Sequence, residues 1–170
     1  MDFRIEQRIR RPLSDVERDL LDPEFISATG ALPKLHDCVV LDRTDRGDEV
    51  RLRVHRRFAA DLPAVVTAVI DPARLTWVEE IAHDRTTHRA SHRIAPDHYA
   101  DRLRCSYTTS LVERDGITTR VAVGALTVKA LLAARPIEQA IVSGLREYAE
   151  AEATLLETWV PASDEPHPRH

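Results

Sequence analysis

A small set of polar residues falls at positions where the sequence predicts a buried face. Side chains on one face of a strand recur at every second residue, so parity assigns each residue of a strand to a face. On the more apolar face these residues are Gln7, Arg56, Glu79, His88, His92, Tyr107, Thr109 and, from a helix, Glu152. Groups of these kinds, if they converge in one cavity, can bind the polar part of a ligand or transfer protons.

Arg56 and Glu79 each interrupt an otherwise apolar row, on strands that can be neighbours. They can form a buried ion pair, or Arg56 can receive a ligand carboxylate or phosphate through its forked donors. The alternative is that Arg56 lies near a strand end and extends its charge to water.

His88 and His92 are four residues apart in a predicted strand, so both should point the same way with Ala90 between them. They can act as ligand donors or as a general acid and base, because histidine titrates near neutral pH. The alternative is a structural role at the pocket rim. Their spacing matches no zinc signature. We therefore expect neither a metal nor a cofactor.

Trp77, Tyr107 and Tyr148 are predicted to be aromatic residues of the pocket wall, with Cys105 as a small apolar neighbour. The sequence contains no glycine-rich phosphate loop, nucleophile elbow or dinucleotide fingerprint.

A long helix over residues 136–160 must close the cavity. Its apolar residues recur at helical spacing and are Ile137, Ile141, Leu145, Tyr148, Leu155 and Trp159. The stripe is interrupted at Ala151 and Glu152. Either Glu152 places a carboxylate over the cavity, or a small rotation brings Ala151 inward and leaves Glu152 in solvent.

Seven strands are predicted, ending in a hairpin about Asp115-Gly116. The strands cover residues 2–11, 36–45, 49–58, 75–81, 85–94, 103–113 and 117–128. The hairpin register places Tyr107 opposite Gly124, Cys105 opposite Leu126 and Leu103 opposite Val128. A glycine opposite a tyrosine should leave room above the sheet, so Gly124 joins the candidate ligand-binding residues.

Two short helices are predicted after the first strand. Ser14 and Glu17 match a capping box at the start of the first helix. Asp22 and Pro23 match the N-cap and first position of the second helix, and Gly30 can end it in a left-handed conformation. A further short, apolar and helical insert is expected over residues 61–70.

Composition predicts one globular domain over residues 1–160, with 43% hydrophobic and 31% charged residues in a chain of 170. Residues 161–170 are polar and proline-rich, and we expect them to be disordered. Two widely separated cysteines, Cys38 and Cys105, with no signal peptide or membrane span, predict a cytoplasmic protein. The net charge of -4 does not suggest a nucleic-acid binder.

Arginines dominate the opposite, outer face of the predicted sheet. They are Arg4, Arg8, Arg10, Arg51, Arg53, Arg57, Arg85, Arg89, Arg93, Arg102 and Arg104. This face can dock an anionic membrane surface or an acidic protein. The alternative is a solvated face with cross-strand pairs to Glu6 and Glu80.

The order of these elements resembles that of the START-like superfamily, which includes polyketide cyclases and the birch-pollen allergen. The segments that carry the resemblance are Leu21-Asp22-Pro23-Glu24, Leu126-Thr127-Val128-Lys129, Ile137-Glu138 and Glu157-Thr158-Trp159. The insert beginning Asp61-Leu62-Pro63 is most similar to an uncharacterised bacterial branch. The resemblance covers about residues 2–160. It implies an α+β helix-grip fold, in which a curved antiparallel sheet wraps a long C-terminal helix around a cavity for a lipid or other hydrophobic molecule. It implies no fixed catalytic residues.

Three functions follow as hypotheses. The first is a carrier, sensor or transfer protein for a lipid-like or polycyclic compound. The second is a cofactor-independent enzyme of cyclase, dehydratase or hydrolase type using His88, His92, Glu79 or Tyr107. The third is a docking module that uses the arginine-rich outer face.

Overall fold

The structure, a computed structural model, describes residues 1–59, 62, 64–68, 70–130 and 133–161. Its strands are β1 (Asp2–Ile9), β2 (Lys34–Asp45), β3 (Glu49–Ala59), β4 (Thr76–Asp84), β5 (Arg89–Pro96), β6 (Leu103–Arg114) and β7 (Ile117–Val128). Its helices are α1 (Leu13–Leu20), α2 (Pro23–Ala28), α3 (Ala64–Thr67) and α4 (Ala134–Thr158), with 3-10 turns at Thr29–Ala31 and Pro72–Arg74. The tail expected to be disordered lies outside the described residues, apart from Pro161.

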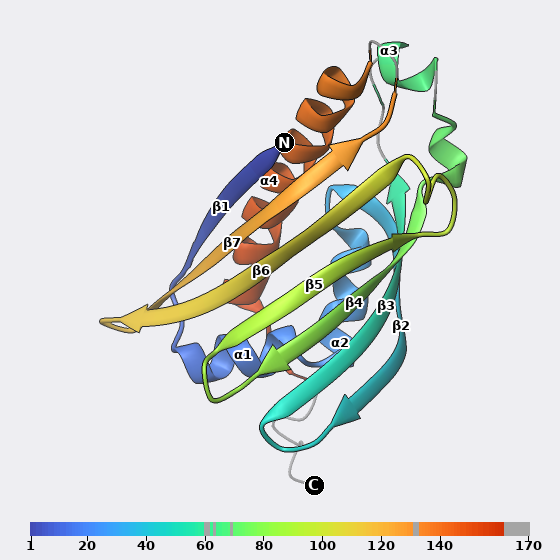
Figure 1. Cartoon of the computed structure of the whole chain (residues 1–170). Helices are drawn as coiled ribbons and strands as arrows, with labels where there is room; N and C mark the ends of the chain where they lie inside the picture. The colour runs from blue at the N-terminus through green and yellow to red at the C-terminus, as the bar shows by residue number, and fades with distance from the viewer. Residues whose placement is uncertain (60–61, 63, 69, 131–132, 162–170) are drawn as a thin grey trace, which may run out of the picture.

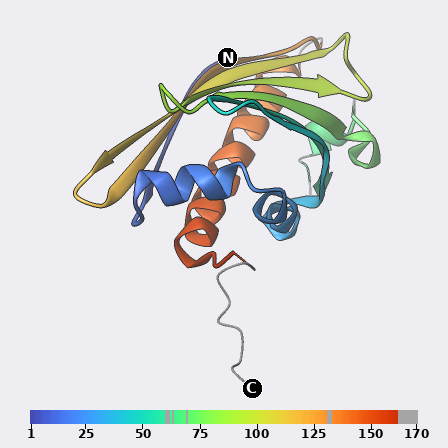
Figure 2. The same ribbon diagram turned by 90° about the horizontal axis from the view of Figure 1, so that it is seen from below.

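The strands form one antiparallel sheet of seven in the order β1-β7-β6-β5-β4-β3-β2. Figure 1 shows α4 on one side of this sheet, behind β1, β7 and β6. Figure 2 shows the sheet curving over α4, with α1 and α2 on the same side. The predicted curved seven-stranded sheet around a long C-terminal helix is confirmed.

The hairpin between β6 and β7 has the predicted register. Asp115 and Gly116 both have positive φ, at 53° and 72°, as a two-residue hairpin turn requires. Tyr107 therefore pairs with Gly124, and the inner side chains of the two strands alternate with exposed ones. This pairing orients every second side chain of β6 and β7 toward α4.

Helix α4 begins at Ala134, two residues before Pro136, and ends at Thr158. Pro136 thus lies in the first turn, where the N–H groups have no partner within the helix. The buried residues of α4 are Ile137, Val142, Ala149, Glu152 and Leu156. The rotation that would leave Glu152 in solvent does not occur.

The predicted capping box at Ser14 is wrong. Helix α1 begins at Leu13 with Pro12 as its N-cap, and no side chain caps it. The Glu17 carboxylate contacts two histidines instead of turning back to the helix start. These tertiary partners lie far along the sequence, so the local motif could not reveal them.

The second helix is capped as predicted, but it ends differently. Asp22 accepts a hydrogen bond from Glu24 N, and Pro23 is the first helical residue. Gly30 lies in the 3-10 turn that follows, and its φ is not positive. A Cβ at Gly30 would lie 2.9 Å from the backbone nitrogen of Cys38, so close packing against β2 is what requires a glycine there.

Strand β5 begins at Arg89 instead of Arg85. Asp84 accepts hydrogen bonds from the backbone N–H groups of Thr86 and Thr87, which forms a tight turn before β5. His88 ends this turn with φ 54°. The prediction that His88 and His92 share a strand face is therefore wrong.

The apolar core of the described residues is divided into four clusters. One lies between β3 and α2, a second between β1 and the middle of α4, a third beneath α1, and a fourth at the start of α4. Their most buried members include Val54, Leu126, Leu156 and Ile137. A domain usually has one contiguous core, so the division indicates a cavity among the clusters.

None of the helices in the described part of the chain is long and apolar enough to span a membrane.

Candidate functional site

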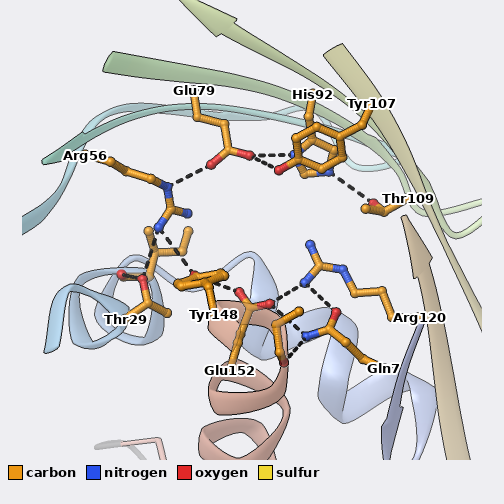
Figure 3. Close-up of polar contacts among 12 residues, drawn as sticks. Gln7, Thr29, Arg56, Glu79, His92, Tyr107, Thr109, Arg120, Tyr148 and Glu152 are labelled. Carbon is orange, nitrogen blue, oxygen red and sulfur yellow. Dashed lines mark hydrogen bonds and ion pairs between the residues drawn. The ribbon is translucent and has the colours of Figure 1, made fainter. Parts of the chain in front are cut away.

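A cavity of about 510 Å³ lies between the inner face of the sheet and α4. Most of its wall is apolar, and the wall includes residues of all four core clusters, such as Ile26, Phe3, Leu126, Phe25 and Ile137. This volume falls within the range of small-molecule sites. Two groups of polar side chains project into it, one from the sheet and one around α4, and both appear in Figure 3.

The sheet group is centred on Glu79 of β4. Its Oε2 accepts a hydrogen bond from Arg56 Nε at 2.8 Å, and its Oε1 accepts from the Tyr107 hydroxyl and from His92 Nδ1, the latter at 2.9 Å. His92 Nε2 lies 3.1 Å from Thr109 Oγ1. The residues that contact one another in this way come from β3, β4, β5 and β6, so the sheet register holds them in place.

Burial and charge fix the ionisation of this group. Burial alone would raise the pKa of Glu79, but the Arg56 charge and the hydrogen bonds from His92 and Tyr107 hold that pKa well below its usual range. Burial lowers the pKa of His92, so the imidazole is neutral near pH 7. His92 Nδ1–H then donates to Glu79, and Nε2 accepts from the Thr109 hydroxyl. Burial and the Glu79 charge raise the pKa of Tyr107 well above its ordinary value.

The helix group is centred on Glu152 of α4. Its Oε2 accepts from Arg120 Nη1 at 2.7 Å and from Gln7 Nε2 at 3.1 Å, and its Oε1 accepts from the Tyr148 hydroxyl at 3.0 Å. Gln7 Nε2 also donates to the Ala149 carbonyl. These contacts explain why the interruption in the apolar stripe faces inward: Glu152 has polar partners on β1, β7 and its own helix.

Arg56 links the two groups. Its Nη1 lies 3.3 Å from Thr29 Oγ1, and 3.4 Å from both Cys38 Sγ and the Tyr148 hydroxyl. Its guanidinium also lies 5.8 Å from the centre of the Tyr148 ring, within the range of a cation–π contact. The side chain is largely buried, so the alternative in which Arg56 extends to water is excluded.

Most of the residues predicted to bind ligand line this cavity. They are Arg56, Trp77, Glu79, His92, Cys105, Tyr107, Tyr148 and Glu152. Their role in binding stays a prediction. Burial raises the pKa of the Cys105 thiol to about 11, so at neutral pH the thiol is protonated and is not an activated nucleophile.

His88 and Gly124 do not line the cavity. His88 projects from the turn before β5 toward α1, where its Nδ1 lies 2.9 Å from Glu17 Oε1. A Cβ at Gly124 would lie 2.3 Å from the Tyr107 Cβ. The expectation of free space beside Gly124 is therefore wrong, because Tyr107 itself covers the glycine.

Arg120 is the main residue of the site that the sequence reasoning missed. It pairs with Leu111 across the β6–β7 hairpin, four residues along β7 from Gly124. Parity from Gly124 places it on the inner face, so the hairpin register already contained the signal. Like Arg56, Arg120 interrupts an otherwise apolar row, which indicates a buried ion pair or a ligand contact.

Among the described residues, no group of three or more histidine, cysteine, aspartate or glutamate side chains could hold a metal ion. His83 and His88 both contact Glu17 Oε1, at 2.7 and 2.9 Å. These three residues form a hydrogen-bonded cluster between α1 and the β4–β5 turn.

Part of the outer arginine face is paired with acidic neighbours, whereas Arg8, Arg53, Arg57, Arg89 and Arg104 form no ion pair with the described residues. Arg4 pairs with Glu6, Arg51 with Glu49, and Arg93 with Glu80. Arg85 lies in the turn before β5 and pairs with Asp45. The prediction that Arg102 lies on the outer face is wrong, because Arg102 precedes β6 and lines the cavity.

A family model described as "Protein of unknown function (DUF2505)" matches residues 4–160. A search of the curated proteins finds no match.

Solved structures share the fold at low sequence identity. TTHA0849 from Thermus thermophilus is 17% identical with a TM-score of 0.67, and the match covers 92% of this chain and 94% of that one. The Zhui aromatase/cyclase from Streptomyces sp. R1128 is 14% identical, with a TM-score of 0.68 and coverage of 96% and 98%. Norcoclaurine synthase from Thalictrum flavum is 16% identical, with a TM-score of 0.60 and coverage of 94% and 87%. This similarity confirms the helix-grip fold.

Proposed function

The chain belongs to the DUF2505 family, and we propose that it binds a hydrophobic small molecule, such as a lipid or polycyclic metabolite, between the sheet and α4. The observation that carries this proposal is the cavity of about 510 Å³, whose accessible wall is mostly apolar and whose buried polar groups form two hydrogen-bonded clusters. Residues 1–160 act in this proposal as one ligand-binding domain. The protein is a carrier, sensor or transfer protein under this reading.

The ionisation of the cavity groups supports binding more than acid–base catalysis. A general acid or base needs a pKa near the working pH and a free position that reaches the substrate. The pKa of Glu79 is held low, that of Tyr107 is raised, and that of Cys105 is about 11. Both ring nitrogens of His92 are already engaged, by Glu79 and Thr109. The cyclase, dehydratase or hydrolase alternative therefore has less support.

The outer face supports the docking alternative less well. Exposed arginines that already pair with neighbouring carboxylates offer less free positive charge to an anionic membrane surface or an acidic protein. A cytoplasmic location is part of our proposal, because Cys38 and Cys105 are both free thiols, as in a reducing compartment.

Gly144 offers a direct test of where the ligand binds. This residue of α4 lines the cavity, and a Cβ there would meet only the Lys34 side chain, at 3.8 Å. We expect Gly144→Phe to fill part of the cavity and to weaken binding of the neutral fluorescent probe N-phenyl-1-naphthylamine by about tenfold or more.

Gly144→Ala is the matched control. It adds one methyl group, should leave probe binding within about twofold, and should stabilise the helix by about 0.5–1 kcal/mol.

Mild solvent extraction of purified wild-type protein followed by mass spectrometry should also recover a hydrophobic compound. Equal probe binding by the Phe and Ala variants would place the site elsewhere. A protein that yields no such compound and binds neither the probe nor a broad lipid panel would contradict the proposal.

A further inference from the structure

Two guanidinium groups in the cavity have unused hydrogen-bond donors. Arg56 uses Nε for Glu79, and Nη1 for Thr29, Cys38 and Tyr148. Arg120 uses Nη1 for Gln7 and Glu152. Within the described part of the chain, Arg56 Nη2 and Arg120 Nε and Nη2 make no hydrogen bond. Figure 3 shows an unbonded nitrogen of each group pointing into the space between the sheet and α4.

These donors face the cavity and not the packed interior. Among the described residues, Trp159 Nε1 is the one side-chain nitrogen or oxygen that is both fully buried and without a partner. The unused arginine nitrogens are therefore not fully buried, and the cavity can reach them. The arginine side chains are nevertheless only 11% and 12% exposed. A donor in such a position costs free energy unless an acceptor reaches it from the cavity.

The two buried arginines of the cavity are already paired with carboxylates. Arg56 pairs with Glu79, and Arg120 pairs with Glu152. The wall also contains Lys34, which pairs with Glu147, and the solvent-exposed Arg74, Arg102 and Lys129. His92 is neutral near pH 7 because burial lowers its pKa, and Tyr107, whose pKa is raised, stays protonated. A bound carboxylate or phosphate would add an uncompensated negative charge to a poorly solvated space, whereas a neutral acceptor would add none.

Resting on the proposed function, we infer that the bound molecule carries a neutral carbonyl oxygen, as in a ketone, quinone or ester, which accepts hydrogen bonds from Arg56 and Arg120. A carbonyl oxygen has two lone pairs and can accept two hydrogen bonds. Its apolar body would lie against wall residues such as Ile94, Leu103 and Leu145. The arginines thus select a polar group, while the rest of the cavity selects size and hydrophobicity.

Three probes with one ring skeleton test this inference: fluorene, 9-fluorenone and fluorene-9-carboxylate. Calorimetry on the whole protein should give fluorenone at least about tenfold tighter binding than fluorene, because even one charge-assisted hydrogen bond typically contributes that much. The carboxylate should bind no better than the hydrocarbon. Bound fluorenone should also show a carbonyl infrared band at lower frequency than in a nonpolar solvent, because donated hydrogen bonds polarise the C=O bond.

The variants Arg56→Lys and Arg120→Lys keep the charge and remove the forked donors. Each should still bind fluorene, which shows that it folds, and should lose most of the preference for fluorenone together with the infrared shift. Arg93→Lys, in the exposed pair with Glu80, is the matched control and should change neither.

The outcomes separate the inference from the function on which it rests. Fluorene binding without a preference for fluorenone, or tightest binding of the carboxylate, overturns the neutral-carbonyl inference and leaves the hydrophobic site intact. Failure of all three probes to bind counts against both. Retention of the full ketone preference in both lysine variants would show that the arginines do not hold the carbonyl.

Discussion

Neighbouring residues of β4 place the same kind of ion pair on opposite faces of the sheet. Glu79 faces the cavity and pairs with Arg56 at 2.8 Å, with side chains 5% and 11% exposed. Glu80 faces outward and pairs with Arg93 at 2.6 Å, with side chains 36% and 66% exposed. The distances are similar, but their surroundings differ. Water screens the outer pair, whereas the inner carboxylate also holds His92 and Tyr107.

This comparison separates a surface contact from a site. The outer pair can be lost to solvent with little change elsewhere, because water can hydrate each freed charge. The inner pair cannot be lost singly, because its partners would keep buried charge and donors without acceptors. Charge and distance alone would rank the two pairs equally, so burial and shared partners decide which one organises the cavity.

The largest expected difference comes from neutralising each glutamate in turn. Glu79→Gln should destabilise the fold by about 3–5 kcal/mol, because it leaves the buried Arg56 without a counter-charge. Glu80→Gln should cost less than about 1 kcal/mol. Urea unfolding of both variants measures the two values. Equal and small losses would show that the inner pair contributes no more than a surface pair.

A second contrast uses the next pair of opposite-facing neighbours, on β7. Gly124→Ala should destabilise by about 1–3 kcal/mol, because the new methyl group would overlap the Tyr107 Cβ and push the ring away from Phe3. Val123 is exposed on the outer face, so Val123→Ala should cost less than about 1 kcal/mol. Thermal unfolding reports both changes. A neutral Gly124→Ala would mean that Tyr107 moves freely.

The smallest effect is a pH dependence that belongs to the inner face. The pKa of His92 is lowered in the folded protein, whereas in the unfolded chain His92 has its ordinary pKa of 6.5. As the pH falls below 6.5, His92 is therefore protonated in the unfolded chain but stays neutral in the folded protein. Stability is therefore present above pH 6.5 and is lost below it, by at most about 1.4 kcal/mol per pH unit. Because the folded pKa of Glu79 is also lowered, Glu79 adds a further loss below about pH 4.5, where its unfolded carboxyl is protonated.

Urea midpoints between about pH 5 and 7.5 should fall more steeply with acid in wild type than in His92→Gln. His55, whose outer-face pair with Asp97 is partly exposed, supplies the control variant His55→Gln. Parallel pH curves for wild type and His92→Gln would show that His92 titrates normally.

The sequence predicted the sheet well because strand parity and the Asp115-Gly116 turn are local signals. The same parity correctly brought Glu79, His92, Tyr107 and Thr109 to one face. Arg120 was missed although parity from Gly124 included it. His88 was misplaced because the turn that removes it from β5 contains no glycine. The clue was the side chain of Asp84, which binds the next backbone N–H groups.

The inward orientation of Glu152 could not be derived from the helix alone. The spacing of the apolar stripe hardly distinguishes a helix with Ala151 inward from one with Glu152 inward. The contacts that decide the orientation come from Gln7 on β1 and Arg120 on β7. Long-range partners of this kind appear only when the sheet is assembled.

The division of the core around a cavity should affect the amount of this protein in a cell. The cavity wall includes residues of all four clusters, and under the proposed function the ligand would bind the folded chain alone. By mass action, a free concentration about one hundred times the Kd would then add about 2.7 kcal/mol to the free energy of unfolding. Proteolysis acts on unfolded chains, so turnover of the protein would slow when its ligand is plentiful and quicken when it is scarce.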